Sequence, residues 1–243
     1  MLTGIVLLNA QQPPAFDVAV IKPADPTNTR VGLGFGPNGR TLTIDGLTPM
    51  QIIREAFGVF PDQLTASPSL INSGWIDSQK YDISAKSEGD TPLSKAQSSL
   101  MLQQLLADRF GLKIHRETKE ITVYSLLVGK NGPKLNPGGA SGPYLSAPSP
   151  GKLVGTRASM SSLVRALGGQ LHRPVFDDTG ITGAWDFTLT WAPDDIGSDA
   201  ASSDPTRPSL FTALQDQLGL RLVSKKSPVD VIVIDQISKP SAN

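Results

Sequence analysis

Residues 100–128 and 210–236 carry the same order of hydrophobic and polar positions. The two stretches align without gaps, and the apolar pattern is kept where identity is not. The identical residues include the pairs Leu102 and Leu210, Leu106 and Leu214, Asp108 and Asp216, Gly111 and Gly219, Leu112 and Leu220, and Val123 and Val231. This repetition indicates an internally duplicated chain.

The repeated unit changes its hydrophobic period once. Apolar residues first recur at helical spacing, which predicts an amphipathic helix. The helix is expected to end at Gly111 and at Gly219, because glycine readily adopts the left-handed conformation of a helix end. Alternating residues then predict two strands joined by a polar turn, at residues 116–120 in one copy and 224–228 in the other. Each copy is therefore predicted to be a helix followed by a β-hairpin.

The similarity extends toward the start of each half. A helix is predicted after Thr48, a favoured N-cap residue with proline following it, and a matching helix begins at Ser159. Strands at residues 40–45 and 152–157 precede these helices. An aromatic-Asp-apolar strand follows each of them, at 81–83 and at 185–187. The fold class expected is α+β, with two similar halves. Each half is expected to have the order strand-helix-strand-helix-strand-strand, with its two helices packed on a mostly antiparallel sheet.

Segments rich in Pro, Gly, Ser and Asn separate these elements. We expect a signal-peptide remnant at residues 1–10, a first half at 11–136, a linker at 137–150 and a second half at 151–243. Residues 24–38 and 192–208 are predicted to be loops. The first loop contains GLGFG at 32–36, which lacks the following helix and lysine of a phosphate-binding loop and is interpreted as flexible.

Composition narrows the possible partners. The chain has 22 acidic and 22 basic residues, with no long run of either sign, so no nucleic-acid partner is indicated. It has no cysteine, which excludes disulfides and thiolate chemistry. No stretch reaches the roughly 20 apolar residues of a membrane span, so the mature chain is expected to be soluble. No cofactor is indicated, and the oligomeric state stays open.

The first ten residues, MLTGIVLLNA, are apolar and end in small residues, as in a signal peptide before its cleavage site. The basic start typical of such signals is missing. The alternative is a short buried N-terminal strand. The signal-peptide interpretation predicts a secreted or periplasmic protein.

Short motifs distributed over residues 16–243 resemble the soil-associated protein family of Acidobacteria, a domain of unknown function. The motifs are FDV at 16–18, IKP at 21–23, GW at 74–75, YDI at 81–83, LLADRF at 105–110, HRET at 115–118, GPKL at 132–135, RPV at 173–175, DTG at 178–180, residues 183–187, VID at 233–235 and KPS at 239–241. The resemblance implies a secreted or envelope protein. Related domains are attached to membrane metallopeptidases of the antibiotic-sensor type, but this chain has no HExxH motif. The resemblance implies no catalytic residues.

Aromatic residues beside carboxylates are the candidate binding residues. Exposed aromatic rings near a carboxylate suit peptide or sugar binding. The alternative, favoured by the usual burial of such rings, is that the aromatics pack in the core and each Asp caps a turn. The candidates are Trp75, Tyr81, Asp82, Asp177, Asp178, Trp185 and Asp186.

Catalytic and metal-binding patterns are sparse. His115 is predicted to be an exposed strand residue and His172 to lie at a helix end. A Ser-His-Asp triad through His172 has no supporting GxSxG motif. The acidic residues at 194, 195, 199 and 204 match no calcium-binding loop. No metal site and no catalytic residue is predicted.

The function favoured by these observations is a non-enzymatic module that binds an envelope or secreted protein or peptide, because exposed strand edges allow strand addition. One alternative is a hydrolase that uses carboxylates such as Asp177, Asp178 and Asp186. Another is a sensor that binds a small ligand between the two halves. A pocket that gathers carboxylates with perturbed pKa values favours the hydrolase, whereas an open sheet edge or apolar patch favours the binding module.

Overall fold

The computed structural model of this chain describes residues 14–89, 91–193 and 207–240. The contacts group the chain into two compact units. Unit 1 contains the residues up to Thr118 and those from Asp230 onward, and unit 2 contains Lys119–Val229. Helices and strands occur in both units, so the α+β class is confirmed.

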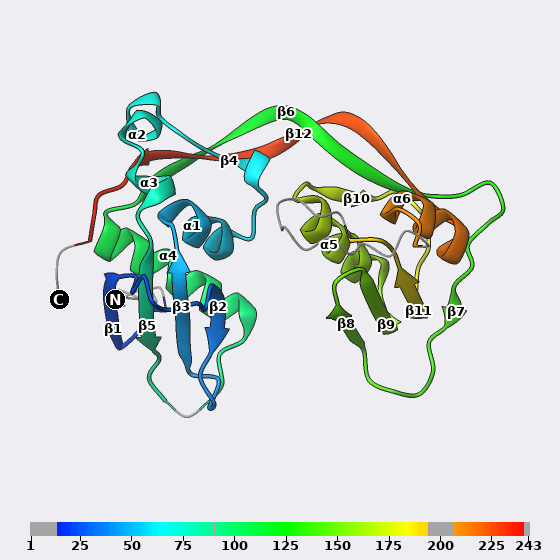
Figure 1. The fold of residues 1–243 in the computed structure, drawn as a ribbon, viewed down its shortest axis with the longest axis horizontal. Helices are drawn as coiled ribbons and strands as arrows, with labels where there is room; N and C mark the ends of the chain where they lie inside the picture. The colour runs from blue at the N-terminus through cyan, green and yellow to red at the C-terminus, as the bar shows by residue number, and fades with distance from the viewer. Residues whose placement is uncertain (1–13, 90, 194–206, 241–243) are drawn as a thin grey trace, which may run out of the picture. The chain divides into compact units, whose positions relative to one another are not determined.

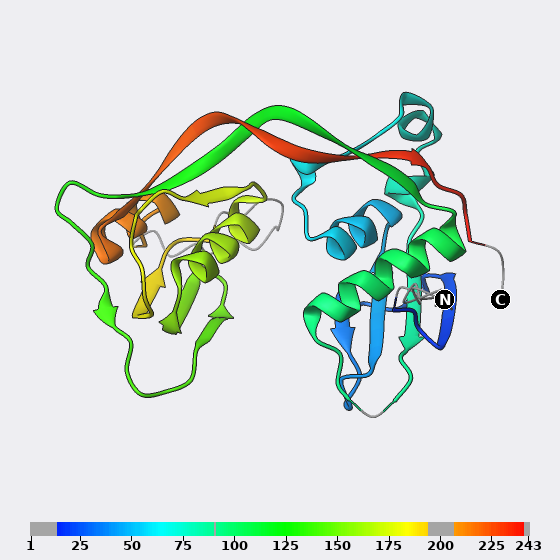
Figure 2. The same cartoon turned by 180° about the vertical axis from the view of Figure 1, so that it is seen from behind.

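Unit 1 is built on a four-stranded antiparallel sheet with strand order β1-β5-β3-β2. Helix α4 lies across one face of this sheet (Figures 1 and 2). The strands are β1 (Val18–Pro23), β2 (Gly32–Phe35), β3 (Thr41–Leu47) and β5 (Tyr81–Lys86). The helical segments are α1 (Pro49–Phe57), the short 3-10 turn η1 (Pro61–Gln63), α2 (Pro68–Ser73), α3 (Trp75–Ser78) and α4 (Lys95–Phe110).

Helix α1 begins where the sequence predicts, after Thr48. The backbone N–H of Gln51 donates to the Thr48 hydroxyl at 3.4 Å, and the Gln51 side chain accepts from the Thr48 N–H at 2.9 Å. These bonds satisfy two N–H groups that the helix leaves without an internal partner. Gly58 ends the helix in the left-handed conformation, with φ of 62°.

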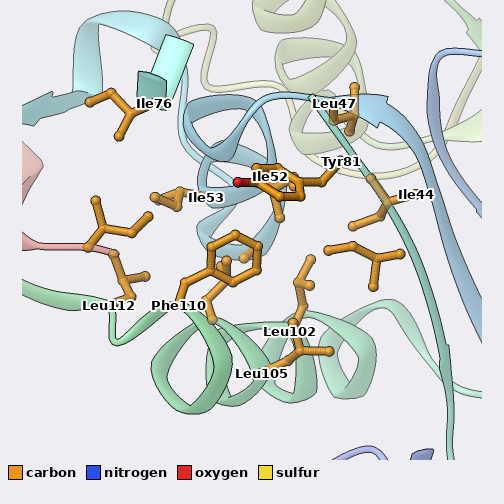
Figure 3. Packing of buried hydrophobic residues seen from close by; sticks show 14 of the residues in the cluster. Ile44, Leu47, Ile52, Ile53, Ile76, Tyr81, Leu102, Leu105, Phe110 and Leu112 are labelled. Atoms are coloured by element: carbon orange, nitrogen blue, oxygen red, sulfur yellow. The ribbon is translucent and has the colours of Figure 1, made fainter. Parts of the chain in front are cut away.

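The core of unit 1 lies between the sheet and helices α1 and α4. Phe110, at the end of α4, is fully buried, and its ring contacts the Tyr81 ring edge-on with centroids 5.5 Å apart. Figure 3 shows this ring next to Ile53 of α1 and Leu112. The apolar stripe predicted for the helix before Gly111 is therefore the face that α4 buries.

Unit 2 has a sheet of the same size, with strand order β7-β11-β9-β8. Its core contains apolar side chains from β9, β11, α5, α6 and η2. The strands are β7 (Asn136–Pro137), β8 (Tyr144–Ser149), β9 (Lys152–Ala158) and β11 (Trp185–Thr190). The helices are α5 (Met160–Leu171), α6 (Leu210–Ala213) and η2 (Leu214–Leu218), which is a π-helical turn.

The two predicted β-hairpins are wrong. Each is one long strand, β6 (Lys113–Val128) and β12 (Leu220–Gln236), and the two are neighbours in a sheet of order β10-β6-β12-β4. Residues 116–120 contain none of the residues that favour a turn. Residues 224–228 do contain Ser224, Ser227 and Pro228, but β12 pairs with β6 and continues through them. The short strands β10 (Val175–Asp177) and β4 (Leu64–Ala66) pair in parallel with β6 and β12 respectively. Strand β6 starts in unit 1 and ends in unit 2, whereas β12 starts in unit 2 and ends in unit 1.

Two predicted loops also differ from the structure. Strand β2 lies within residues 24–38, and β8 lies within the proposed linker at 137–150. Both are edge strands, where weak intrinsic β-propensity is tolerated because pairing with one neighbour suffices. The first ten residues lie outside the described residues. The predicted halves and the internal duplication stay predictions, whereas the compact units are defined by contacts.

Candidate functional site

Strand β2 is the edge of the unit 1 sheet and pairs on one side with β3. No other described strand pairs with it. Its sequence, GLGF, has apolar side chains at alternate positions only. The side chains of Leu33 and Phe35 are 36% and 44% exposed, and the preceding Val31 is 64% exposed. Large apolar groups therefore lie along an open sheet edge.

The direction of the backbone groups of β2 follows from one hydrogen bond. The N–H of Gly36 donates to the carbonyl oxygen of Thr41 at 2.8 Å, so the backbone of Gly36 faces β3. Backbone direction alternates along a strand. The N–H and C=O groups of Leu33 and Phe35 therefore face away from β3, toward the open edge.

A groove of about 230 Å³ runs beside this edge. Leu33 and Phe35 are opposite Ile44 and Leu42 of β3, which are core residues, so all four side chains are on the sheet face that the helices cover. The groove is floored by apolar side chains and rimmed by polar ones. Its lining comes from β2, β3, α1 and α4: Leu33, Phe35, Leu42, Glu55, Lys95, Ser98, Ser99 and Leu102.

The candidates Asp82 and Asp186 both accept backbone hydrogen bonds from a left-handed residue on the neighbouring strand. Asp82 accepts from the N–H of Gly46 at 2.9 Å, and Asp186 accepts from the N–H of Arg157 at 2.6 Å. Asp186 also accepts from the N–H of Gly139 at 3.1 Å. The hydrogen bonds from Arg157 and then Gly139 lower the pKa of Asp186. Both carboxylates hold irregular backbone in place.

The three candidate aromatic residues pack onto the cores. Tyr81 is 3% exposed, and burial raises the pKa of its hydroxyl. Trp75 packs against the core of unit 1 and Trp185 against that of unit 2. The indole N–H of Trp185 donates to the carbonyl oxygen of Thr182 at 3.1 Å. As ligand-binding residues these side chains stay predictions.

Asp177 is the last residue of β10, Asp178 follows it, and the two carboxylates have different partners. Asp177 accepts from the N–H and the hydroxyl of Thr179, at 3.1 and 2.6 Å. Asp178 accepts from the ammonium of Lys225 at 2.8 Å and from the hydroxyl of Ser125. The Lys225 hydrogen bond, followed by that of Ser125, lowers the pKa of Asp178. A carboxylate stabilised in its charged form is a weak base.

Asp178 and Asp186 share no hydrogen-bond partner, so these bonds do not join the carboxylates of the hydrolase hypothesis into one group. Ser125, whose hydroxyl donates to Asp178, is 3% exposed. A nucleophile needs access to its substrate. Asp178 therefore forms an ion pair with Lys225 and accepts a hydrogen bond from the buried Ser125.

His115 lies on β6, exposed as predicted, between two carboxylates. Its Nδ1 is 2.7 Å from Asp235, and its Nε2 is 3.0 Å from Glu117. These hydrogen bonds, first that to Glu117 and then that to Asp235, raise the pKa of His115. His172 is at the end of α5, as expected, in the left-handed conformation with φ of 52°.

Within residues 14–89, 91–193 and 207–240, no group of three or more His, Asp or Glu side chains is arranged to hold a metal ion. None of the described helices is both long and apolar enough to cross a membrane. The acidic residues at 194, 195, 199 and 204 lie outside this part of the chain.

These features define an α+β protein with an open, partly apolar sheet edge. The chain belongs to the family DUF3738, described as a protein of unknown function, whose sequence profile matches residues 50–237. No curated protein and no solved structure shows significant similarity to the chain. The family assignment therefore brings no activity or site residue with it.

The sequence interpretation missed Leu33 and Phe35. Their alternation with Gly32, Gly34 and Gly36 was the available signal, since a period of two is typical of a strand. The glycines and the neighbouring Pro37 favoured a loop instead. Their open edge also depends on pairing with residues 42–45, which the local pattern does not specify.

Proposed function

We propose that this protein is a non-enzymatic module that binds an extended segment of a partner protein along the open edge of β2. The observation that carries the proposal is the combination of outward-facing backbone groups with a groove for side chains at Leu33 and Phe35. Strand addition uses both features, because backbone bonds give affinity and side-chain pockets give specificity.

The backbone contribution comes from β2. Leu33 and Phe35 each present an N–H and a C=O toward the open edge, as the Gly36 hydrogen bond to Thr41 indicates. A partner segment that lies beside β2 satisfies these groups and lengthens the sheet by one strand. Gly34, between them, presents no side chain on the opposite face of the strand. Access to the edge is therefore wide for an incoming backbone.

The side-chain contribution comes from the groove. Alternate side chains of an added strand project to the face that Leu33 and Phe35 occupy. There they meet the exposed parts of Leu33 and Phe35, which lie over Leu42 and Leu102, each at most 1% exposed. Glu55 and Lys95 give the rim both signs of charge. The ligand expected is an extended peptide with small or medium apolar residues at alternate positions, flanked by charged residues.

A random-peptide phage library selected on the immobilised protein tests this function, with affinities of the recovered synthetic peptides measured by fluorescence anisotropy. Phe35→Ser removes an apolar contact, and Leu33→Pro removes an outward N–H without removing a bond to β3. Burial of one such side chain stabilises by about 1.5–3 kcal/mol, so Phe35→Ser is expected to weaken binding about tenfold or more.

Val20→Ser is the matched control, because Val20 is 47% exposed on β1, the opposite edge of the same sheet. Binding by this variant is expected to equal that of the wild type. The proposal is wrong if no peptide is enriched on the folded wild type relative to Phe35→Ser. It is also wrong if Val20→Ser loses as much affinity as Phe35→Ser.

We further propose that the protein acts outside the cytoplasm, in the periplasm or in the medium. The apolar residues 1–10 with their small-residue end support this location, as does the absence of cysteine, which leaves no thiol to oxidise. Fractionation of cells that express a C-terminally tagged chain is expected to place it in the periplasm or medium, without residues 1–10. A cytoplasmic chain that retains them contradicts this location.

We infer that the two sheets arose by internal duplication. In each unit an aromatic-Asp strand occupies the same place in the strand order, β5 in one and β11 in the other. The equivalent hydrogen bonds of Asp82 to Gly46 and of Asp186 to Arg157 support this origin, as do the aligned residues 100–128 and 210–236. Significant similarity between alignments of the two halves, built from many family members, is the expected result. Similarity no greater than that of shuffled sequences argues against duplication.

A further inference from the structure

A second cavity, of about 650 Å³, lies within unit 2, where the loop after β6 meets the end of η2. Its walls carry three basic side chains, Lys130, Lys134 and Arg221, and one carboxylate, Asp216. Lys130 and Lys134 come from the loop, and Arg221 comes from the start of β12. Positive charge thus reaches the cavity from two separate segments of the chain.

The loop that carries the two lysines is fixed to η2 by backbone hydrogen bonds. The N–H groups of Gly129 and Lys134 donate to the carbonyl oxygens of Gly219 and Leu218, both at 2.8 Å. The contact is so close that a Cβ at Gly219 would be 2.1 Å from the carbonyl oxygen of Gly132. The lysines are therefore held on preorganised backbone, which lowers the entropy cost of binding a ligand.

The basic groups of this cavity are not neutralised by ion pairs within the described residues. The ammonium of Lys134 donates to the backbone oxygen of Asp216 at 2.8 Å, which positions it without cancelling its charge. The Asp216 carboxylate is the acidic group in the lining. Three cations and one anion leave a net positive cavity, and a concave wall concentrates this potential.

We propose that this cavity binds a small anionic ligand that carries a phosphate group and hydroxyl groups, such as a polyol phosphate. The guanidinium of Arg221 and the ammonium of Lys130 are suited to the phosphate oxygens, since charge-assisted hydrogen bonds of this kind are strong. The carboxylate of Asp216 accepts hydrogen bonds and is suited to a ligand hydroxyl. Asn131 and Gln215, also in the lining, supply neutral amide donors and acceptors.

The test uses glycerol 1-phosphate and inorganic phosphate, titrated into the full chain and followed by ¹H–¹⁵N NMR. Saturable shifts are expected at the amides of residues 129–134 and 215–221. The double variant Lys130→Gln/Arg221→Gln is expected to bind glycerol 1-phosphate at least about tenfold more weakly, because it loses two charge-assisted contacts. Thermal unfolding checks that the variant is folded.

The matched control is Lys152→Gln/Lys226→Gln, which lowers the net charge of unit 2 by the same amount but leaves the cavity lining intact. Binding by this control is expected to match the wild type. Shifts that do not saturate, or an equal loss of affinity in the control, overturn the proposal in favour of non-specific charge attraction.

The same phosphate chemistry occurs in a free solute and in a lipid headgroup. Co-sedimentation with phosphatidylglycerol vesicles separates the two sources, with phosphatidylcholine vesicles as the neutral reference. Sedimentation lost in Lys130→Gln/Arg221→Gln supports the lipid, and saturable binding of glycerol 1-phosphate without sedimentation supports the solute. If the protein binds neither glycerol 1-phosphate nor the vesicles, the proposed site is wrong.

Discussion

Gly219→Ala tests whether the close approach between η2 and the loop after β6 stabilises unit 2. Gly219 has φ of 66°, and an added Cβ would lie 2.1 Å from the Gly132 oxygen and 3.0 Å from the Lys134 nitrogen. The loop would have to move by roughly 1 Å, because real Cβ contacts are essentially never shorter than 3.0 Å. Such a movement weakens the hydrogen bond from the Lys134 N–H to Leu218.

The expected loss of unfolding free energy in Gly219→Ala has a conformational part and a packing part. A left-handed alanine costs about 1–2 kcal/mol, partly offset by the lower entropy of the unfolded chain, which leaves about 1 kcal/mol. Overpacking adds about 1–3 kcal/mol. Gly219→Ala is therefore expected to lower the free energy of unfolding by about 2–4 kcal/mol.

Gly180→Ala is the matched control for the conformational part. Gly180 is also in unit 2, has φ of 69° and has no atom within 4 Å of an added Cβ, so a loss of about 1 kcal/mol is expected. Urea unfolding followed by tryptophan fluorescence measures both variants, since Trp185 and Trp191 lie in unit 2. Equal losses for the two variants would refute the packing argument.

Three further outcomes are expected. NMR titration of His115 should give a pKa above 6.5, and Glu117→Gln or Asp235→Asn should lower that pKa. The contribution of protonated His115 to stability is complete below the unfolded-state pKa of 6.5 and is lost as pH rises through the folded-state pKa. A pKa of 6.5 in the folded protein contradicts this prediction. Arg157→Gly should raise the free energy of unfolding by about 1 kcal/mol, because it removes a left-handed non-glycine residue with φ of 46°, and a clear loss in urea unfolding contradicts this. Phe110→Ala should lower that free energy by about 3–5 kcal/mol by removing a fully buried ring, and a loss under 1 kcal/mol in the same assay shows that the site collapses around the gap.

Helix ends were predicted correctly where capping residues close together in the sequence define them. The Thr48 N-cap with proline after it defined the start of α1, and Gly111 defined the end of α4. In both cases the capping groups lie within a few residues of one another in sequence. Short-range geometry decides such positions, so one sequence is enough to identify them.

The candidate site was less accessible to sequence reasoning. The aromatic-Asp strands were found, but the partners of their carboxylates lie far away in sequence, as Asp82 and Gly46 show. The glycines beside Leu33 and Phe35 match local turn preferences and predict a loop in place of the open edge. Whether a glycine-rich segment becomes a strand depends on the neighbour with which it pairs.

Sequence patterns alone predict the α+β class, the helix that follows Thr48, the apolar face of α4 and the absence of thiol chemistry. These depend on hydrophobic period, capping residues and composition, all of which are local or additive. The folded chain was needed to establish that β6 and β12 are continuous neighbouring strands and that β2 has an open edge. Strand pairing satisfies backbone groups across long sequence separations, so it depends on a residue's neighbours in space and not on its neighbours in sequence.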